Sequence, residues 1–568
     1  MKRNKFIFLL VLFFIILAAY LRFYNLQANT LYGDSGYELE KARQINQFKK
    51  LPLVGPTLEL VDVVIPPTYL YLIAFLYFIA GGEIKIISAL FALMGFLTVI
   101  IFSFLVYILS KNKGIAVLFI AIFSISHYFI HVSRMIWHPH PVLFFLSLSF
   151  LFLTLSLRMK KKPYLFLGQF LFFISLSIYP SPIFVLPIVL YYSYVFFNRI
   201  EAYSKIKSLI YILLSNSVFI LLVYLPLLVN EINFGFFSRL SSVLGIFRDN
   251  VSINSEIIVE TFFNISKILS QVFFSWDVSP QLHLLFFLFL FFLFSLLVFY
   301  KKRLNFLTKI YINPFLYLWI LAIVYLLNIA GAQDFHRLDV LFFLFFILLA
   351  IGLELILSFK ANSFLKICLL LPVIIFLSIY FYINIRNSFL IFKSDKWSSG
   401  TIYSYEKVSN LIADEIVTKN LERSRTMVLN KANFGEDTFT YDANNSLNYL
   451  RLLRHIAQSN DFFINKSSFN EERSVENYNL FIRFLSDHTH FLNNIDYYFL
   501  ICDSGNYETE LIIQESEACL QEVLFNLKNI DVHNRHLFLT LSSYYFVDQN
   551  ENYSPEVIFL IKKQSKLK

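Results

Sequence analysis

The chain has 568 residues, of which 57% are hydrophobic and 15% charged, with a net charge of +9 and a mean hydropathy of +0.62. This composition excludes an ordinary soluble protein and is typical of a chain that crosses a membrane many times. A positive balance would suggest nucleic acid as the partner of a soluble protein. Here Lys and Arg cluster between apolar runs, as membrane topology requires, so no nucleic acid is expected.

The N-terminal segment Met1-Lys-Arg-Asn-Lys5 precedes an apolar run over residues 6–20, which is the pattern of a secretory signal peptide. No small-x-small cleavage site follows the run, because the next residues are Leu21-Arg-Phe-Tyr24. The pattern therefore favours an uncleaved signal anchor, which is the first membrane-spanning helix.

A helix needs about 20 apolar residues to cross the hydrocarbon core of a membrane. The run 67–80 is ambiguous, because it has about 14 residues before Gly81-Gly82 and is too short to cross comfortably. The other apolar runs predict a polytopic α-helical membrane protein with about eleven spanning helices, at residues 6–24, 84–109, 114–132, 141–158, 164–179, 182–197, 207–229, 280–300, 311–330, 338–359 and 364–385.

The basic residues decide whether 67–80 crosses. If this run lies in the interface, the basic connections between the other helices all fall on the N-terminal side; if it spans, they all lie outside. Because cytoplasmic loops carry the excess of Lys and Arg, we expect an interfacial 67–80, a cytoplasmic N-terminus and an extracytoplasmic C-terminus in the cell membrane. The connections contain Lys111 and Lys113, Arg158 to Lys162, Arg199, Lys205 and Lys207, Lys301 to Arg303, Lys309, Lys360 and Lys366.

The chain divides by composition into two units. Residues 1–386 form the membrane unit, with a juxtamembrane loop at 25–83, and residues 387–568 are richer in charged residues and Asn. Apolar runs at 497–501 and 557–561 have the length of strands, and helical patterns precede them. We therefore expect a small extracytoplasmic α/β or α+β domain at the C-terminus.

The expected topology places the unusual polar passages of the membrane unit on one side. They are the loops 31–43 and 133–141, the turn 178–182, the long loop 230–279 and the segment 333–337. Carboxylates beside a bilayer are costly unless they are solvated or used. A gathering of such residues predicts an active site at the outer leaflet.

The first of these loops contains Asp34 and Glu38. Asp34 either caps a helix over 35–49, as Asp commonly does, or accepts a proton from an attacking hydroxyl, and the two roles are compatible. Glu38 lies one turn later on the same helix face, where it either orients a substrate or is solvated. Glu59 and Asp62 are the next candidates for the base.

Metal ligands are scarce. His138 and His140 flank prolines in one outer loop, and two nearby histidines can bind a metal, but no third ligand stands at a recognisable spacing. Cys368, Cys502 and Cys519 show no CxxC spacing. We expect no metal site or cofactor, while metal dependence and a pairing of the last two cysteines are left open.

Two arginines stand apart from the cytoplasmic basic loops. Arg134 and Arg337 each lie at the outer end of a predicted helix. An arginine in this position either extends its side chain to lipid headgroups or holds a phosphate by two parallel hydrogen bonds. The sequence leaves both roles open.

The order of motifs resembles the GT-C glycosyltransferases, and within them the bacterial dolichyl-phosphate-mannose–protein mannosyltransferase-like group, family 39. The outer acid is followed by Leu53-Val-Gly-Pro-Thr57 and Pro66-Pro-Thr-Tyr-Leu-Tyr-Leu72, and the resemblance covers about residues 6–360. Ser133-Arg-Met-Ile-Trp-His-Pro139 is similar to an S-R-x-x-W-N-P motif with His138 in place of Asn, and Phe335-His-Arg-Leu338 to an arginine motif. The chain departs from the group around Tyr179, where a histidine is common, and at Glu38, where Asp is common.

The resemblance implies a glycosyltransferase that moves a sugar from a polyprenyl-phosphate-linked donor to a lipid, glycan or protein acceptor, with inversion at the anomeric carbon. It implies Asp34 as the base, assisted by Glu38. It also implies that the leaving phosphate needs charge stabilisation, which Arg337, Arg134 or His336 would supply. Further substrate contacts are expected from Glu59, Asp62, His138, His140, Tyr179 and Glu231.

The alternative is a multi-span transporter or flippase of a lipid-linked substrate. Such a protein carries charges at mid-helix near the bilayer midplane and has paired broken helices. Charges at mid-helix are scarce here, and the main one, Glu354, lies near the inner end of its helix. The outer cluster of polar motifs therefore favours the transferase.

Overall fold

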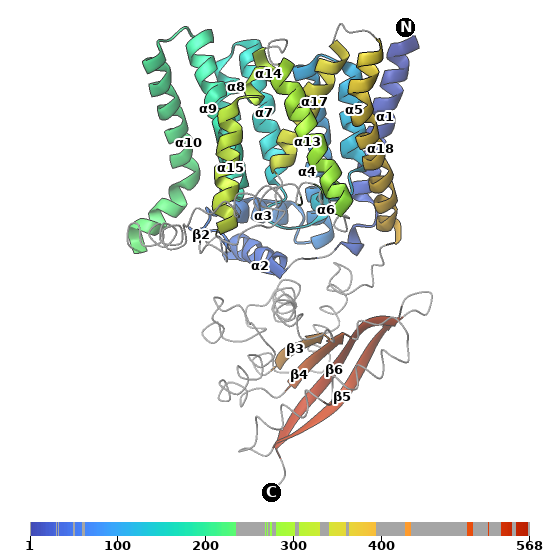
Figure 1. Cartoon of the computed structure of the whole chain (residues 1–568). Helices are drawn as coiled ribbons and strands as arrows, with labels where there is room; N and C mark the ends of the chain where they lie inside the picture. Colours follow the sequence, from blue (N-terminus) through green and yellow to red (C-terminus); the bar gives the residue numbers. More distant parts are fainter. Residues whose placement is uncertain are drawn as a thin grey trace.

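The computed structural model describes residues 2–29, 31, 33–48, 51–58, 63–234, 267, 270, 273–274, 280–300, 306–329, 340–358, 363–393, 426–432, 497–503, 521, 536–547 and 553–565. Its main body is a bundle of long apolar helices. Short helices lie across one end of the bundle, and a four-stranded sheet lies beyond that end (Figure 1). The chain is therefore a polytopic helical membrane protein, as its composition predicts.

The long helices follow the predicted apolar runs. Within the described ranges, nine helices are long and apolar enough to cross a membrane, or up to ten if one bent pair is a single span. One further helix, α8, has 17 residues and falls just short of that length. The helices of the bundle are α1 (Lys2–Phe23), α4 (Ile84–Ser110), α5 (Lys113–Ile125), α7 (Val142–Met159), α8 (Lys162–Ile178), α9 (Leu186–Val195), α10 (Lys205–Phe234), α13 (Pro280–Tyr300), α14 (Phe306–Tyr311), α15 (Pro314–Ile329), α17 (Val340–Ser358) and α18 (Ser363–Lys393). Of these, α14 and α15 count as one span, and α5 is the first half of the bent pair.

The predicted span 114–132 is not a single straight helix. It consists of α5 and a second helix, α6 (His127–Arg134), bent against each other by 60°. Ser126 ends the first helix and caps the second, since its side chain accepts a hydrogen bond from the backbone N–H of Phe129 at 3.5 Å. Ser126 and His127 interrupt the apolar run at this point, and the second helix is much less apolar than the first, so the predicted single span 114–132 was wrong in its continuity.

Two helices lie across the end of the bundle where α1 ends (Figure 1). They are α2 (Gly33–Phe48), which covers the helix expected over 35–49 but begins before Asp34, and α3 (Thr68–Ile79). The 12 residues of α3 reach about 18 Å, well short of the roughly 30 Å of a hydrocarbon core. The expectation that 67–80 is a short helix at the membrane surface therefore agrees with its length and place. Asn46 of α2 donates a hydrogen bond to the backbone oxygen of Ala74 in α3 at 2.8 Å, which joins the pair.

The chain between α2 and α3 folds back on itself at Gly55. Strands β1 (Thr57–Leu58) and β2 (Val63–Val64) pair antiparallel, and the N–H of Gly55 donates to the oxygen of Ile65 at 2.8 Å. A Cβ at position 55 would lie 2.4 Å from the backbone oxygen of Pro66. The close approach of two backbone segments is the physical reason for the glycine in the Gly-Pro element.

The interior of the bundle is filled with aromatic rings. Helix α17 is buried along almost its whole length, as expected for a helix that is apolar on every side. Its Phe346 packs against Phe123 at 4.6 Å, Phe273 at 4.9 Å and Phe119 at 5.9 Å between ring centroids. These contacts join distant parts of the chain and give the bundle a rigid centre.

The C-terminal strands form one mixed sheet in the order β3-β4-β6-β5. Strands β3 (Thr426–Ala432) and β4 (Tyr497–Asp503) are parallel, while β4 with β6 (Tyr553–Ser565) and β6 with β5 (His536–Val547) are antiparallel. The predicted runs 497–501 and 557–561 fall in β4 and β6, which are neighbours, with Leu500 opposite Phe559. The expected helical patterns 404–418 and 445–458 lie outside the described residues.

The two ends of the chain lie at opposite ends of the bundle. The N-terminus is at the end away from α2 and α3, and the C-terminal sheet lies beyond the end that carries them (Figure 1). Helix α18 leads toward the sheet and runs on to Lys393, past the apolar run that ends at 385. The two short helices α2 and α3 and the sheet therefore lie toward the same end of the bundle.

Candidate functional site

The polar centre of the described structure is the carboxylate of Glu38 on α2. Its side chain is fully buried, with 0% exposure. One oxygen, Oε1, lies 2.8 Å from Nδ1 of His138, and the other, Oε2, accepts a hydrogen bond from the hydroxyl of Tyr69 at 2.9 Å. A buried carboxylate is costly unless it is paired, and both oxygens of Glu38 have a partner.

Three parts of the chain form this cluster. Glu38 belongs to α2, Tyr69 to the first turn of α3, and His138 to the loop between α6 and α7. Ser35 ties α2 to that loop, since its hydroxyl donates to the backbone oxygen of Ile136 at 2.6 Å. Pro141 directly precedes α7 and sets the direction in which the loop enters that helix.

Aromatic side chains enclose the imidazole of His138. Its ring centroid lies 5.5 Å from Tyr179, 5.7 Å from Trp137 and 5.9 Å from Tyr69. Tyr179 is buried at the end of α8, where the backbone turns extended. The structure thus brings together three residues that the sequence nominated separately, Glu38, His138 and Tyr179.

Tyr69 was not predicted as a site residue from the sequence, although its hydroxyl donates to one of the two oxygens of the Glu38 carboxylate. It lies in the motif Pro66-Pro-Thr-Tyr-Leu-Tyr-Leu72, so a signal was present in the sequence. The motif contains two tyrosines, and only the fold distinguishes them. Tyr71 turns the other way, and its hydroxyl donates to the backbone oxygen of Pro52 at 2.6 Å.

The Glu38–His138 contact sets the chemistry of the imidazole. When Nδ1–H donates to the carboxylate, neutral His138 keeps Nε2 as a hydrogen-bond acceptor. A carboxylate that accepts a hydrogen bond from Nδ1 of a histidine fixes the orientation of its ring. The pair is therefore able to position a substrate group or share its proton.

Asp34 lies one helical turn before Glu38, in the first turn of α2. Residues four apart share a helix face, so the two positions lie on the same side of α2. The first turn also suits a carboxylate because the helix N-terminus carries partial positive charge. The orientation of the Asp34 side chain lies outside the described residues, and its roles as cap and base stay predictions.

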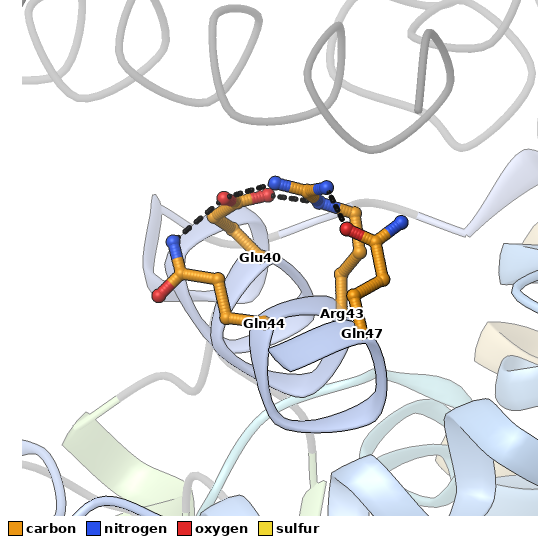
Figure 2. A network of polar contacts seen from close by, with 4 residues as sticks. All are labelled: Glu40, Arg43, Gln44 and Gln47. Atoms are coloured by element: carbon orange, nitrogen blue, oxygen red, sulfur yellow. Dashed lines mark hydrogen bonds and ion pairs between the residues drawn. The ribbon is translucent and has the colours of Figure 1, made fainter. Parts of the chain in front are cut away.

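A second polar network lies farther along α2 (Figure 2). Arg43 donates through Nε and Nη2 to the two oxygens of Glu40, each at 2.8 Å, and Gln44 donates to the same carboxylate at 2.7 Å. Arg43 also donates to the side-chain oxygen of Gln47. Its hydrogen bonds with Glu40 raise the pKa of Arg43 above its ordinary value. Glu40 is therefore held by an arginine, unlike Glu38.

Arg134 fastens α6 to the end of α1. Its Nη2 donates to the backbone oxygen of Asn25 at 2.8 Å, and the side chain is buried. The backbone oxygen of Arg134 accepts from Asn29 at 2.9 Å and from Ser88 at 2.6 Å. These contacts give Arg134 a structural role, and its role at a donor phosphate stays a prediction.

His140 does not join His138 at a common point. Its Nδ1 lies 3.2 Å from the backbone oxygen of Met135, and its ring packs against Trp137 at 5.3 Å. Within the described ranges no three His, Cys, Asp or Glu side chains gather as metal ligands. The two histidines of the loop therefore face different surroundings.

The side chains of the other predicted site residues lie outside the described part of the chain. Glu59, Asp62, His336 and Arg337 lie outside the described residues. Glu231 belongs to α10, but its side chain lies outside what the structure describes. Their assignments as base, phosphate ligand or substrate contact stay predictions.

The fold defines a class of membrane protein. Its members have a bundle of spanning helices, two short helices across one end of the bundle, and polar side chains next to these short helices. Among solved structures, the chain is similar to ArnT from Cupriavidus metallidurans bound to undecaprenyl phosphate, with a TM-score of 0.50 and 12% identity over 97% of each chain. The apo state of ArnT gives a TM-score of 0.49 and 12% identity, over 99% of this chain and 98% of that one. No protein-family model and no curated protein sequence matches the chain.

The likeness to the lipid-bound ArnT structure concerns the fold alone, because the two sequences are only 12% identical. It extends over almost the whole of both chains. The chain therefore has a polytopic helical fold like that of ArnT. The finer assignment to family 39 stays a prediction.

Proposed function

We propose that this protein is a membrane glycosyltransferase that moves a sugar from a polyprenyl-phosphate-linked donor to an acceptor hydroxyl. The observation that carries the proposal is the buried Glu38 carboxylate, held by His138 and Tyr69 on a surface helix directly after the first span. The similar ArnT structure is bound to undecaprenyl phosphate, which supports a donor of this chemistry. A polar site at the membrane surface suits a substrate that is presented from the lipid.

In the proposed reaction the acceptor hydroxyl attacks the anomeric carbon of the donor. The hydroxyl proton passes to a carboxylate, the bond between the anomeric carbon and the phosphate oxygen breaks, and polyprenyl phosphate leaves with the bonding electrons. Attack opposite the leaving group inverts the anomeric centre. The leaving group is already an anion, so it needs charge stabilisation more than it needs an acid.

Asp34 is the proposed base. Both oxygens of Glu38 have fixed partners, which makes this carboxylate suited to position the helix and His138. Asp34, one turn earlier, lies nearer the start of the helix. A general base must reach the proton that it accepts, and the two oxygens of Glu38 are already engaged by His138 and Tyr69.

The remaining assignments follow the same proposal. Arg337, His336 and Arg134 stabilise the donor phosphate, since a planar guanidinium binds phosphate through two parallel hydrogen bonds. The acceptor and the sugar are contacted by the other nominated side chains, Glu59, Asp62, His138, His140, Tyr179 and Glu231.

The site faces the outside of the cell in this proposal. The N-terminus and the α2–α3 end lie at opposite ends of the bundle (Figure 1). The basic connections belong to the N-terminal end when the helices alternate in direction, and the positive-inside rule places that end in the cytoplasm. The C-terminal sheet is then extracytoplasmic, as a second domain over 387–568.

Sugar transfer by the purified full-length protein tests the proposal. The protein is incubated in detergent with a radiolabelled polyprenyl-phosphate sugar and extracts of the cell envelope as the source of acceptor. We expect label in an acceptor fraction together with free polyprenyl phosphate. Intact donor and no labelled acceptor, from protein that remains folded, would overturn the assignment as a transferase.

A further inference from the structure

The loop that presents His138 to Glu38 also presents His140 to a separate cavity. This cavity lies among α1, α4, α5, α6 and α7 and has a volume of about 30 Å³. A single water occupies about 10–15 Å³ on this measure, so the space holds two or three oxygen-sized groups. It is too small for a sugar ring and admits two or three oxygens of a phosphate group. Its polar lining includes Arg22, His140, Ser133 and Thr98.

Arg22 is the charged group of the cavity. Only 1% of this residue is exposed. Nη1 donates to the backbone oxygen of Ala18 at 3.3 Å, and Nη2 donates to that of Phe123 at 3.0 Å. The remaining nitrogen, Nε, is buried and has no hydrogen-bond partner within the described ranges.

No carboxylate balances the charge of Arg22 in the part of the chain that the structure describes. A second buried arginine, Arg134, lies on α6 close to the same end of α1 and adds charge of the same sign. A buried cation without a counter-charge is costly. An anion bound at Nε would satisfy both the unpaired N–H and the charge.

The depth of Arg22 fits a lipid phosphate. It stands twenty residues after Lys2 on one continuous helix, a distance of about 30 Å. That is roughly the thickness of the hydrocarbon core. Arg22 therefore lies at the membrane interface opposite the N-terminus, where lipid phosphates are found.

The cavity is bordered by side chains that lie at the outer surface of the bundle. Met94 and Thr98 of α4 and Phe144 of α7 line it and are each partly exposed. These positions belong to long apolar helices that face lipid in a membrane. An apolar chain can therefore lie against α4 and α7 while its head reaches the cavity from the side.

We propose that this cavity binds the phosphate of a membrane lipid, with Nε of Arg22 donating to a phosphate oxygen and the lipid chain lying against the partly exposed side chains of α4 and α7. The ligand chemistry is an anionic phosphate on a long apolar chain. The donor of the proposed reaction and an ordinary anionic phospholipid both have this chemistry. Assignment of the site to the donor rests on the proposed function, whereas the site itself does not.

Lipid binding to the full-length protein tests the site. The purified protein is titrated in detergent with undecaprenyl phosphate and, separately, with phosphatidylglycerol, and bound lipid is counted by native mass spectrometry. Arg22→Gln removes the charge and should lower affinity by about tenfold or more, because a charge-assisted hydrogen bond is lost. Arg158→Gln is the matched control, since Arg158 is exposed at the other end of α7.

A second variant separates the loss of the site from a loss of folding. Thr98→Phe leaves Arg22 intact and fills the space beside it, so it should also lower lipid affinity while the melting temperature stays near that of the wild type. If both variants bind both lipids as the wild type does, the site is absent. A loss confined to undecaprenyl phosphate assigns the site to the donor, and a loss for both lipids assigns it to anionic lipids in general.

The same variants distinguish the inference from the proposed function. Lipid binding that depends on Arg22, in a wild-type protein that transfers no sugar, would retain the site and overturn the transferase. If the wild type transfers sugar and Arg22→Gln binds lipid as the wild type does, the proposed function as a transferase stands and the proposed lipid site is wrong.

Discussion

Glu38 and His138 are a hundred residues apart in sequence, and their side chains meet at 2.8 Å. The contact joins the surface helix α2 to the loop between α6 and α7, and both partners are buried. A polar contact, rather than apolar packing alone, therefore holds α2 in place. Because Asp34 precedes Glu38 by one turn, the proposed base is positioned by this contact as well.

Replacing Glu38 by Gln tests the positioning role. The amide keeps the size of the side chain and a partner for Tyr69, but it removes the charge that orients His138. We expect sugar transfer to fall by about tenfold, mainly in kcat. Tyr69→Phe is the matched control, because it removes the other hydrogen bond of the carboxylate and leaves the histidine contact. If both variants transfer sugar at the wild-type rate, the cluster of Glu38, His138 and Tyr69 has only a structural role.

Replacing His138 by Asn tests the same contact from the other side. The related motif carries Asn at this position, and an Asn side chain can donate to the Glu38 carboxylate. We expect His138→Asn to retain most of the transfer rate and the melting temperature, whereas His138→Ala leaves a buried carboxylate short of a donor and costs about 1–3 kcal/mol. Thermal unfolding of the two variants, alongside their rates, checks this. A fully active Ala variant would contradict it.

Asp34→Asn tests the base itself. The substitution keeps the size and capping ability of the side chain, since Asn and Asp are similarly good N-caps. It removes the group that accepts the proton, so transfer should fall by about 10²-fold or more while folding is retained. The rate and the circular dichroism of the purified variant are measured together. A wild-type rate would leave Asp34 as a cap and make Glu59 and Asp62 the next candidates.

Arg337→Lys tests the donor phosphate. An ammonium group cannot reproduce the planar fork of a guanidinium, so donor affinity should fall if Arg337 holds the phosphate. Arg134→Lys should have a smaller effect, since Arg134 donates to Asn25 at the end of α1. Donor titrations on the two variants decide. Unchanged affinity in both would remove the phosphate contact from these two arginines and leave His336 as the candidate.

Cysteine labelling tests the orientation in the membrane. Single cysteines at Asn112, Asn305 and Gly400, in a background without the native cysteines, are treated with a membrane-impermeant reagent in whole cells. We expect label at position 400 alone, because the basic connections belong in the cytoplasm. Label at position 112 would reverse the orientation and place the Glu38 cluster on the cytoplasmic side.

Much of the membrane architecture could be predicted from the sequence. Apolar runs of about 20 residues predict spanning helices. The Lys and Arg residues between the runs indicate which connections lie on the cytoplasmic side. The same ordering placed the segments that contain Glu38, His138 and Tyr179 at one end of the bundle, and the resemblance to the GT-C enzymes singled out these residues within them. Their mutual contacts depend on side-chain directions that no pattern in a single sequence encodes.

Other features depend on tertiary contacts and were missed. The 60° bend at Ser126 lies where Ser126 and His127 interrupt the apolar run, a polar signal too short to separate two helices. In the sequence Arg22 looks like an ordinary charged residue at a helix end. In the structure it is buried and donates a hydrogen bond to the backbone oxygen of Phe123, which belongs to another helix. Strands β3 and β5 contain polar residues that interrupt their apolar pattern, so they were not predicted as strands. Strands β4 and β6 have uninterrupted apolar centres and were predicted.

The most direct test of the central claim uses proteoliposomes that contain a polyprenyl-phosphate sugar labelled in both the sugar and the lipid. Cleavage is followed by separating free polyprenyl phosphate from intact donor, with an accessible acceptor on one side, for the wild type and for Asp34→Asn. We predict acceptor-dependent release of polyprenyl phosphate by the wild type and a loss of about 10²-fold in the variant. Donor that moves between leaflets while sugar and lipid stay joined would contradict the account and identify a flippase.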